Sequence, residues 1–384
     1  MRIINQVLIT GGCGFIGLHL AERLSQDEYR VRLMDNLSSQ IHGAVPYLAG
    51  ASILQAPNVE LLRSDVRVRR DWEEALKGVE CVIHFAAETG TAQSMYEIER
   101  YTNTNVLGTA LLMDILANSK HGVKKVILAS SRSVYGEGAY ECDGCRTVYP
   151  DSRSEEQLSS KHWDLLCPTC CGPIQPRATS EDARTRPASI YAATKLAQED
   201  IVRIAGIALG IGTVVFRFQN VYGEGQSLRN PYTGILSIFS NRIRQNLPIY
   251  LFEDGEESRD FVHVSDVAKA VALAIESDRA AGMTLNVGSG RPTSVRKIAE
   301  TLKKSFADRS EPIVSAQYRL GDIRHCYADL SNIASIGFAP EIELEDGLDR
   351  FVDWVKTQPV EVDGLERANN ELAERGLMAK AAVC

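Results

Sequence analysis

The residues Thr10-Gly-Gly-Cys-Gly-Phe-Ile-Gly17 follow a short apolar run and open a stretch of helical periodicity at residues 15–26. Their glycines match both Gly-x-x-Gly-x-x-Gly and Gly-x-Gly-x-x-Gly. Such glycines permit a tight turn and a close approach of the backbone to a pyrophosphate, which the amides at a helix N-terminus can bind. The stretch predicts a dinucleotide-binding turn, with an ordinary flexible turn as the alternative. The residues expected to contact the cofactor here are Gly11, Gly14, Phe15, Ile16 and Gly17.

Apolar runs alternate with helical stretches along the first half of the chain. The runs lie at residues 7–10, 31–34, 81–86, 126–129 and 213–217. Besides the stretch at 15–26, helical periodicity is found at residues 103–119 and 188–209. Continuous apolar strands separated by helices indicate a parallel sheet that is covered on both faces. The predicted fold is therefore α/β, a doubly wound parallel sheet of the Rossmann type.

The length of 384 residues predicts one large domain and a smaller lobe. We expect a dinucleotide-binding Rossmann domain at 1–218, with a polar insert at 137–186, and a smaller α/β substrate-binding lobe at 219–360. Within this lobe, residues of about 261–290 have the pattern of a strand entering a helix and can return to the first domain. A charged tail with helical periodicity follows at 361–384.

The formal net charge of −8 argues against a general affinity for nucleic acid or an anionic membrane, since both are bound through clustered Lys and Arg. The first residues lack the pattern of a signal peptide, and no stretch approaches the roughly 20 apolar residues that span a bilayer. These features predict a cytoplasmic protein, in which paired cysteines indicate metal binding more often than disulfides.

The second apolar run ends in Asp35, eighteen positions after Gly17. A carboxylate at this place can accept hydrogen bonds from the adenosine ribose and repels a 2′-phosphate, so we expect NAD rather than NADP. Asp65 follows a further short run and is expected to meet the adenine edge; an exposed loop aspartate is the alternative.

Tyr191 and Lys195 lie four positions apart, one turn of a helix, so that both side chains project from the same face. A free phenol has a pKa of about 10. A neighbouring cation and an oxidised nicotinamide would stabilise the phenolate, which makes Tyr191 a candidate base near neutral pH. Upstream, a serine pair follows the strand that ends at Ala129, where a hydroxyl can hydrogen-bond the reacting oxygen of a substrate.

Together these motifs resemble the extended short-chain dehydrogenase/reductase family, in its nucleotide-sugar epimerase and dehydratase branch. The resemblance covers roughly residues 5–355, with further matches at His84-Phe-Ala-Ala87, Arg217-Phe-Gln-Asn220 and Arg319-Leu-Gly-Asp322. It implies a tightly bound NAD, a nucleotide-diphosphate sugar as substrate, and a homodimer formed through the helices at 103–119 and 188–209.

The resemblance also implies roles for individual residues. Ser131 completes a catalytic triad with Tyr191 and Lys195, which contact the cofactor as well. Asn105 supports the active-site geometry. Further cofactor-binding residues are Asn36, Val66, Ala86, Ala87 and Asn105, and the substrate-binding residues are Ser133, Asn220, Arg259, Arg319 and Asp322. Among the latter, the resemblance assigns Asn220 to the phosphates, the two arginines to the diphosphate, and Asp322 to the nucleoside ribose.

The residues after Ser131 discriminate between reactions. Dehydratases and decarboxylases of this branch carry acidic residues there, whereas this chain has Arg132 and Ser133. We therefore expect 4-epimerisation: oxidation of C4 to a transient 4-keto sugar, followed by return of the hydride to the opposite face. A 4,6-dehydratase or a 4-ketoreductase is the alternative, and a non-catalytic NAD-binding protein is a third.

Four cysteines of the insert, Cys142, Cys145, Cys167 and Cys170, form the pattern Cys-x2-Cys-x21-Cys-x2-Cys. This spacing is typical of a zinc ribbon and predicts a closed structural zinc site, with Gly144 and Gly172 in the tight turns. Unpaired cysteines or a redox pair are the alternatives, and Cys171 or His162 could substitute as ligands.

The cysteine-rich insert and the stretches at 230–239 and 252–260 are similar to a narrower group of enzymes. This group comprises dTDP-L-rhamnose 4-epimerases and epimerases of antibiotic sugars, which implies a role in deoxysugar or antibiotic biosynthesis. The insert begins a few residues after Tyr135, so we expect it beside the sugar pocket. The nucleotide and the sugar stay open.

Overall fold

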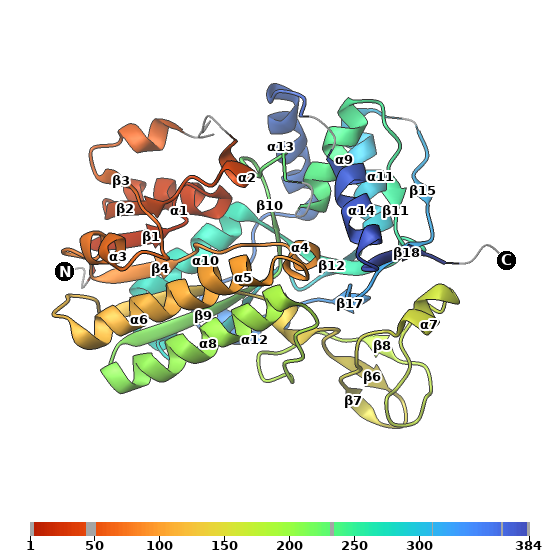
Figure 1. Cartoon of the computed structure of the whole chain (residues 1–384), viewed down its shortest axis with the longest axis horizontal. Helices are drawn as coiled ribbons and strands as arrows, with labels where there is room; N and C mark the ends of the chain where they lie inside the picture. Colours follow the sequence, from red (N-terminus) through yellow and green to blue (C-terminus); the bar gives the residue numbers. More distant parts are fainter. Residues whose placement is uncertain (1–3, 44–50, 231–233, 309, 362–363, 382–384) are drawn as a thin grey trace.

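The computed structural model describes residues 4–43, 51–230, 234–308, 310–361 and 364–381 (Figure 1). Seven parallel strands form the central sheet in the order β13-β9-β5-β4-β1-β2-β3. The chain reverses its direction of winding between β1 and β4, and this reversal leaves a crevice at the carboxyl ends of the strands. The predicted Rossmann-type sheet is confirmed. Its strands are β1 Gln6–Thr10, β2 Arg30–Asp35, β3 Val59–Arg63, β4 Cys81–His84, β5 Lys125–Ser131, β9 Gly212–Phe218 and β13 Thr284–Val287.

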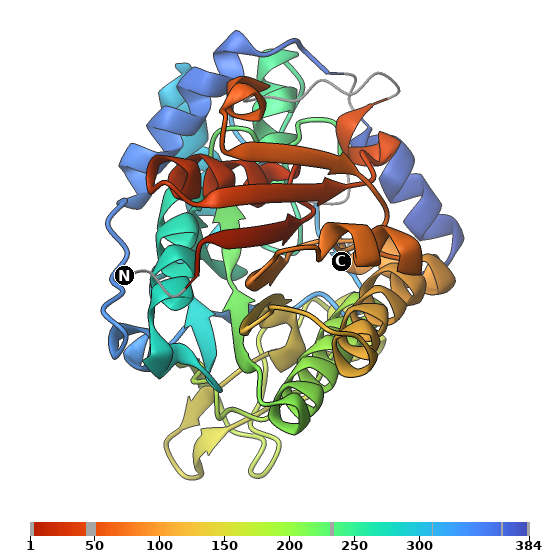
Figure 2. The same ribbon diagram turned by 90° about the vertical axis from the view of Figure 1, so that its left-hand side faces the viewer.

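Helices cover both faces of this sheet because its strands are apolar on both sides. In β1, Val7 and Ile9 point into one core and Leu8 points into the other, all fully buried. Helices α1 (Phe15–Gln26) and α10 (Val264–Glu276) pack against each other on the first face. Helices α3 Arg69–Ala75, α6 Gly108–Asn118 and α8 Ile190–Leu209 cover the second face (Figure 2).

The helix predicted at 103–119 begins earlier than expected. Helix α5 (Ile98–Tyr101) continues through a wider π-helical segment, Thr102–Leu107, into α6. Such a widening displaces side chains from the regular helical positions and is common at functional sites. Here it contains the buried Asn105.

The smaller lobe is built around the mixed sheet of β10 (Asn220–Tyr222), β12 (Ser258–His263), β14 (Pro292–Ser294) and β17 (His325–Cys326). Its core also contains apolar side chains of three helices, α9 Ile235–Arg244, α11 Val295–Phe306 and α13 Leu344–Thr357. The chain returns from β12 to the large domain through α10 and β13, which pairs with β9. The stretch at 230–239 that supported the narrower resemblance lies partly outside the described residues.

The C-terminal tail, for which we predicted helical structure, contains one helix and one strand. Helix α14 (Leu365–Glu374) is followed by strand β18 (Met378–Lys380), which pairs antiparallel with β16 (Gln317–Arg319). The chain turns at Gly376, with a φ of 69°, and the buried Met378 packs inward. Residues of α14 line a pocket together with Arg242 of α9, so this helix lies against the smaller lobe (Figure 1).

The insert is a small separate layer below the sheet in Figure 2. Strand β6 (Tyr140–Cys142) lies between β7 (Arg146–Val148) and β8 (Gln175–Pro176) in an antiparallel sheet, and α7 (Glu155–Ser159) follows. The remaining short elements are α2 Ser39–His42, η1 Ala51–Gln55, α4 Thr91–Ser94, η3 Arg132–Tyr135, β11 Tyr250–Leu251, η4 Asp278–Ala280, β15 Ile313–Val314 and α12 Ser331–Ala334.

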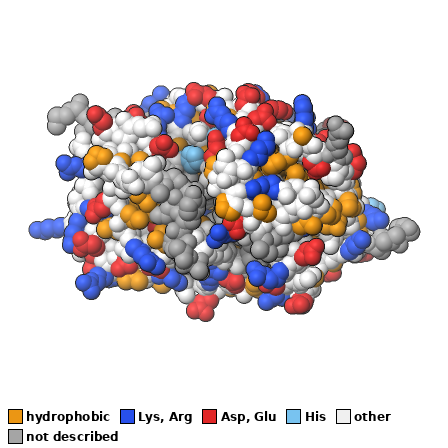
Figure 3. Space-filling model, turned by 90° about the horizontal axis from the view of Figure 1, so that it is seen from above, with side chains coloured by type: hydrophobic (Ala, Val, Ile, Leu, Met, Phe, Trp, Pro, Cys, Tyr) orange, Lys and Arg blue, Asp and Glu red, His pale blue; other side chains and the backbone are white. Residues whose placement is uncertain are grey.

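Charges of both signs are interspersed over the upper face of the molecule, where no extended basic surface is seen (Figure 3). Among the described residues, no helix combines the length and the apolar character needed to cross a membrane.

Candidate active site

A cavity of about 500 Å³ lies at the carboxyl ends of the central strands. It is lined by residues that follow β1, β2, β4, β5 and β9 and by side chains of α8. Of the sequence-predicted site residues, the cavity brings together Gly11, Gly14, Phe15, Ile16, Gly17, Asp35, Asn36, Val66, Ala86, Ala87, Ser131, Ser133, Tyr191, Lys195 and Asn220. The other predicted site residues are not among those that line the cavity: Asp65, Asn105, Arg259, Arg319 and Asp322.

The glycine turn has a geometry that only glycines allow. Gly11 has a φ of 64°, and a Cβ atom on Gly17 would lie 2.5 Å from the Gly11 carbonyl oxygen. Helix α1 starts directly after Gly14, and no side chain caps its N-terminus. Its first amides therefore face the cavity as donors for an anion, which fits the pyrophosphate of a dinucleotide.

Asp35 ends β2 at the wall of the cavity. Its carboxylate accepts hydrogen bonds from the backbone amides of Cys13, at 3.0 Å, and Leu37, at 2.8 Å. These bonds orient the carboxylate between the glycine turn and the start of the next loop. A ribose bound beside the turn would meet it, which fits the predicted preference for a cofactor without a 2′-phosphate.

Asp65 is engaged by the protein itself. Burial raises its pKa, but hydrogen bonds from Arg67 and Asn36 outweigh this effect and bring the pKa to about 2. Its two oxygens accept from the Arg67 guanidinium at 2.9 and 2.7 Å. The cavity is lined by its neighbours Ser64 and Val66 instead.

Tyr191 and Lys195 project from the first turns of α8 toward Ser131 at the end of β5. The serine cap Ser189 accepts a hydrogen bond of 3.1 Å from the amide of Ala192 and so fixes where the helix begins. Lys195 is 2% exposed, and its Nζ donates to the Ala129 carbonyl oxygen at 2.9 Å. Burial lowers the pKa of Lys195 to about 7, against the opposing effect of Glu199.

The protein's own charges do not bring the pKa of the Tyr191 phenol below its ordinary value. Burial raises the pKa of this phenol, and the hydrogen bond with Ser131 and the positive charge of Arg132 offset the rise only in part. A further positive charge, such as an oxidised nicotinamide, is needed to favour the phenolate near neutral pH.

Asn105 does not line the cavity. It supports the residues of the cavity wall through hydrogen bonds and is not placed to contact a ligand itself. Its Nδ2 donates to the Glu88 carbonyl oxygen at 3.1 Å and to Thr194 Oγ1 at 2.9 Å, while its Oδ1 accepts from the Glu88 amide at 2.8 Å. It thereby ties the loop that carries Ala86 and Ala87 to α8.

The residues assigned to the substrate form two groups. Ser133 and Asn220 line the cavity, whereas Arg259 donates to Asp322 at 3.0 Å nearby. Arg319 lies over the Phe252 ring, 4.6 Å from its centre, and donates to Asn369 of α14 at 3.0 Å. The tail therefore holds one of the predicted anion-binding arginines, an interaction that its sequence does not reveal.

Four cysteines of the insert converge. The sulfur atoms of Cys142, Cys145, Cys167 and Cys170 lie within 4.8 Å of one another, and neither Cys171 nor His162 belongs to this group. Gly144 lies in the tight turn of the first pair as predicted, where the Cys145 amide donates to the Cys142 carbonyl oxygen at 3.2 Å, whereas Gly172 follows the turn at 168–170. Arg146 and Cys171, the residues after each pair, have the left-handed conformation, with φ values of 60° and 58°.

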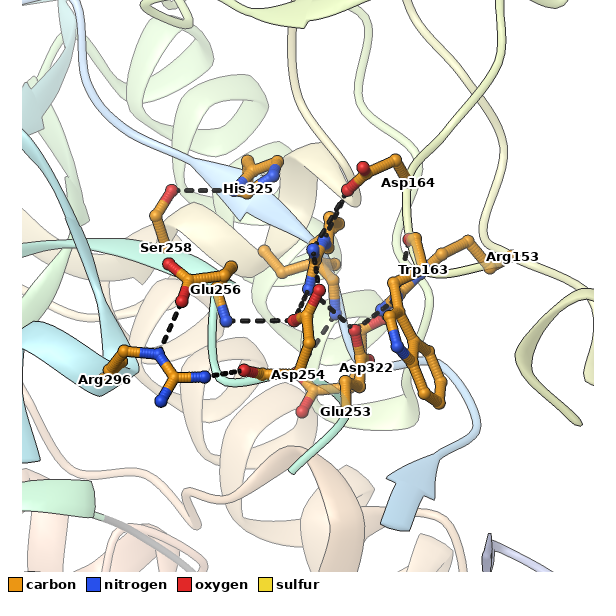
Figure 4. A network of polar contacts seen from close by, with 12 residues as sticks. Arg153, Trp163, Asp164, Glu253, Asp254, Glu256, Ser258, Arg296, Asp322 and His325 are labelled. Carbon is orange, nitrogen blue, oxygen red and sulfur yellow. Dashed lines mark hydrogen bonds and ion pairs between the residues drawn. The ribbon is translucent and has the colours of Figure 1, made fainter. Parts of the chain in front are cut away.

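A network of buried charges connects the insert to the smaller lobe (Figure 4). Arg153, of which 1% of the side chain is exposed, donates to Glu253 at 2.6 Å and to the carbonyl oxygens of Trp163 and Asp322 at 3.1 Å. Arg324 binds Asp254 through two nitrogens, at 2.7 and 2.8 Å, and Asp164 at 3.0 Å. Sequence reasoning missed this network, because its partners are far apart along the chain.

The comparisons with known proteins agree with this architecture. The profile of the NAD dependent epimerase/dehydratase family matches residues 7–155 and 167–288. The dTDP-L-rhamnose 4-epimerase of Burkholderia thailandensis is 38% identical over 354 residues, which cover 91% of this chain and 95% of that protein.

Two solved structures share the fold over nearly their whole length. The UDP-glucose 4-epimerase of Thermotoga maritima with UDP-glucose has a TM-score of 0.74 at 28% identity, covering 91% of this chain and 98% of that one. The UDP-glucose 4-epimerase of Thermus thermophilus in complex with NAD has a TM-score of 0.70 at 26% identity, covering 92% of this chain and 100% of that one. The chain therefore belongs to the NAD dependent epimerase/dehydratase family.

Proposed function

We propose that this protein is an isomerase, an NAD-dependent nucleotide-sugar 4-epimerase. The observation that carries the proposal is the set of groups around Tyr191. The hydroxyl of Ser131 and the Tyr191 phenol line the same cavity, and the described part of the chain places two carboxylates in its wall, Asp35 and Glu88. Asp35 accepts hydrogen bonds from backbone amides, and Glu88 is paired with Arg100 at 2.6 Å. The site thus offers a base for alcohol oxidation and no available acid for elimination of water.

In this mechanism Tyr191 takes the proton of the sugar 4-hydroxyl, while Ser131 hydrogen-bonds the same oxygen and holds it. Bound NAD would supply the hydride acceptor and donor. After the sugar ring has turned over, Tyr191 returns the proton to the oxygen at the inverted carbon. Lys195, anchored on the Ala129 carbonyl oxygen, keeps α8 in place against β5.

The choice of NAD as a tightly held cofactor is supported by the glycine turn, by Asp35 and by the relative whose structure contains NAD. The residues that would hold it are those of the cavity wall at the ends of β1, β2 and β4. Gly17 in particular lets α1 pack closely against the turn, since a Cβ there would lie 2.5 Å from the Gly11 carbonyl oxygen.

The substrate class is a nucleotide-diphosphate sugar. Since the relative at 38% identity is named a dTDP-L-rhamnose 4-epimerase, we propose a dTDP-linked 6-deoxyhexose as the first substrate to examine, with UDP-linked hexoses next. A role in deoxysugar or antibiotic biosynthesis follows from the same resemblance, and both this role and the cytoplasmic location expected from the sequence stay predictions.

We also propose that the insert, 137–186, is zinc-ribbon-like and binds one structural zinc ion. Four thiols within 4.8 Å of one another supply the donor set of a closed tetrahedral site. No step of the reaction depends on this ion. Its place beside the substrate lobe suggests that it stabilises the wall of the sugar pocket.

We propose, in addition, a homodimer formed through α6 and α8. Ile204 and Ile207 on α8 are 60% and 74% exposed, and Leu107 next to α6 is 44% exposed. Apolar side chains of this size on adjacent helices favour burial against a second copy.

The experiment that tests the proposed function is incubation of the purified protein, without added cofactor, with dTDP-, UDP-, GDP- and CDP-linked sugars. Inversion at C4, followed by NMR, supports it. Loss of water, or a strict need for added NADPH, favours the dehydratase or the ketoreductase.

A further inference from the structure

Arg132 lies between Ser131 and Ser133 in the turn η3, and its side chain lines the active-site cavity. Its Nε donates a hydrogen bond of 2.8 Å to Asn220 Oδ1, which fixes the plane of the guanidinium group. Its Nη1 is buried and has no hydrogen-bond partner among the described residues. A buried donor of a cation without a partner is costly, and in a ligand-binding cavity it indicates a group that the ligand completes.

Other positive charges surround this guanidinium. Burial lowers the pKa of Arg132, and the positive charge of Arg259 lowers it further. Asp322, the nearby carboxylate, is already paired with Arg259 at 3.0 Å and interacts with Arg319 as well. Asp322 thus interacts with Arg132, Arg259, Arg319 and also Arg153. Glu137 and Glu257 lie near Arg259 as well, but burial raises their pKa values to about 7 and about 8, so both are partly protonated near neutral pH. The arginines therefore outnumber the fully ionised carboxylates, and an anionic ligand would balance this excess of positive charge.

Neutral groups nearby suit the uncharged part of a substrate. Ser133 Oγ and both polar atoms of the Gln219 side chain are buried without partners, and both residues line the cavity. Hydroxyl groups of a sugar can satisfy them. Sugar hydroxyl groups could also accept a hydrogen bond from Arg132, but they are neutral and would leave the positive charge of the guanidinium without compensation.

We propose that Arg132 binds the diphosphate of the nucleotide sugar through its Nη1, as a third arginine beside Arg259 and Arg319. This inference rests on the proposed function. A diphosphate carries negative charge on two adjacent groups, and a guanidinium offers planar donors that match phosphate oxygens. Arg132, which occupies a position where dehydratases of this branch carry an acidic residue, thus holds the substrate by its diphosphate.

This anchor suits 4-epimerisation. The sugar ring must leave the place beside Tyr191, turn over and return, while the rest of the substrate stays bound. An additional ion pair to the diphosphate resists dissociation during this rotation and lies directly beside Ser131, where the reacting oxygen is held.

The test compares Arg132→Gln with the matched control Arg291→Gln, since the Arg291 side chain is 69% exposed and lies outside the cavity. The NAD-loaded proteins are titrated by calorimetry with UDP, dTDP and UDP-glucuronate, and with uridine and thymidine. We expect Arg132→Gln to weaken binding of the diphosphates by roughly 10- to 100-fold, the effect of a lost charge-assisted hydrogen bond. Binding of the nucleosides and the behaviour of the control stay unchanged.

Two results would overturn the inference. In one, Arg132→Gln binds UDP and dTDP as tightly as the wild type, or the wild type itself binds neither. In the other, binding weakens only for UDP-glucuronate, which would assign the guanidinium to a sugar carboxylate. The melting temperature and the NAD content report folding. If the glutamine variant does not fold, Arg132→Lys keeps the charge without the planar fork and is expected to show a smaller loss of the same kind.

The test is independent of turnover. If the wild type binds diphosphates through Arg132 but inverts no sugar, the proposed function fails and the inference stands. If it inverts a sugar while Arg132→Gln binds diphosphates normally, the inference fails alone.

Discussion

The Nζ atom of Lys195 lies 6.0 Å from the centre of the Tyr191 ring and donates a hydrogen bond of 2.9 Å to the Ala129 carbonyl oxygen. This hydrogen bond fixes α8, which carries Tyr191, to the end of β5, which carries Ser131. Because burial lowers the pKa of Lys195 to about 7 and raises that of Tyr191, deprotonation of the phenol depends on the charges that ligands bring to the cavity.

Replacing Tyr191 by Phe removes the proposed base but keeps the ring. We expect C4 inversion to slow by roughly 100- to 10,000-fold, the contribution of a positioned acid–base group. The NAD content should not change, because the glycine turn and Asp35 are intact. NMR of the reaction and absorbance of the released cofactor measure the two quantities. Turnover that persists in Tyr191→Phe would contradict the assignment, and Tyr149→Phe in the insert is the matched control.

His84 makes stability depend on pH. Burial lowers its pKa to about 3, and Thr10 and Thr109 hydrogen-bond its two ring nitrogens at 2.7 and 3.0 Å. The unfolded chain binds this proton near pH 6.5, so the unfolded state takes up more protons below that pH. Stability is thus fully present above about pH 6.5 and falls toward pH 3, by at most about 1.4 kcal/mol per pH unit.

Urea unfolding at several pH values measures this dependence. His84→Gln should show a shallower loss of stability with falling pH, and exposed His121→Gln should show the wild-type slope. His325, whose pKa burial lowers to about 4, contributes in the same direction and accounts for part of the remaining slope. An unchanged slope in His84→Gln would refute the role of this side chain.

The cysteine cluster predicts the metal content. Atomic absorption on purified protein should find about one zinc ion per chain, as a closed four-thiolate site binds. Cys145→Ser and Cys170→Ser should lose the ion and lower the melting temperature. Cys171→Ser and His162→Asn should retain it, because neither side chain belongs to the cluster. A metal-free protein of unchanged stability would rule out a structural zinc site.

The buried pair of Arg153 and Glu253 joins the insert to the smaller lobe at 2.6 Å. Arg153→Met leaves Glu253 without its closest cation and should cost about 3–5 kcal/mol of unfolding free energy. The double variant Arg153→Met/Glu253→Met should be more stable than the sum of the single changes implies, with a coupling of about 0.5–3 kcal/mol. Denaturant unfolding of the four proteins provides the cycle, and additive effects would show that the contact does not stabilise the native state.

The sequence predicts those parts that depend on neighbouring residues. The turn at Gly11 to Gly17 follows from local backbone sterics, and the helix start at Phe15 matches the structure. The common face of Tyr191 and Lys195 follows from the helical repeat. These features need no knowledge of distant contacts.

The remaining features depend on tertiary structure. The ion pair of Arg153 and Glu253 joins residues that are 100 positions apart, and β18 forms only because β16 offers an edge. Asp65 has the expected place in the chain, yet Arg67 two positions later captures its carboxylate. In the sequence, Arg132 indicates only that an acidic residue is missing at this position. That its Nη1 has no hydrogen-bond partner depends on its surroundings in the fold, which include Asn220 and Arg259.

The most direct test of the central claim follows the hydrogen at C4. A nucleotide sugar deuterated at C4 is incubated with the protein in ordinary water, without added cofactor, and the product is analysed by NMR and mass spectrometry. The account predicts an inverted sugar of unchanged mass that keeps its deuterium at C4, because the hydride leaves and returns within one closed site. Replacement of the deuterium by solvent hydrogen, or a product that has lost water, would contradict it.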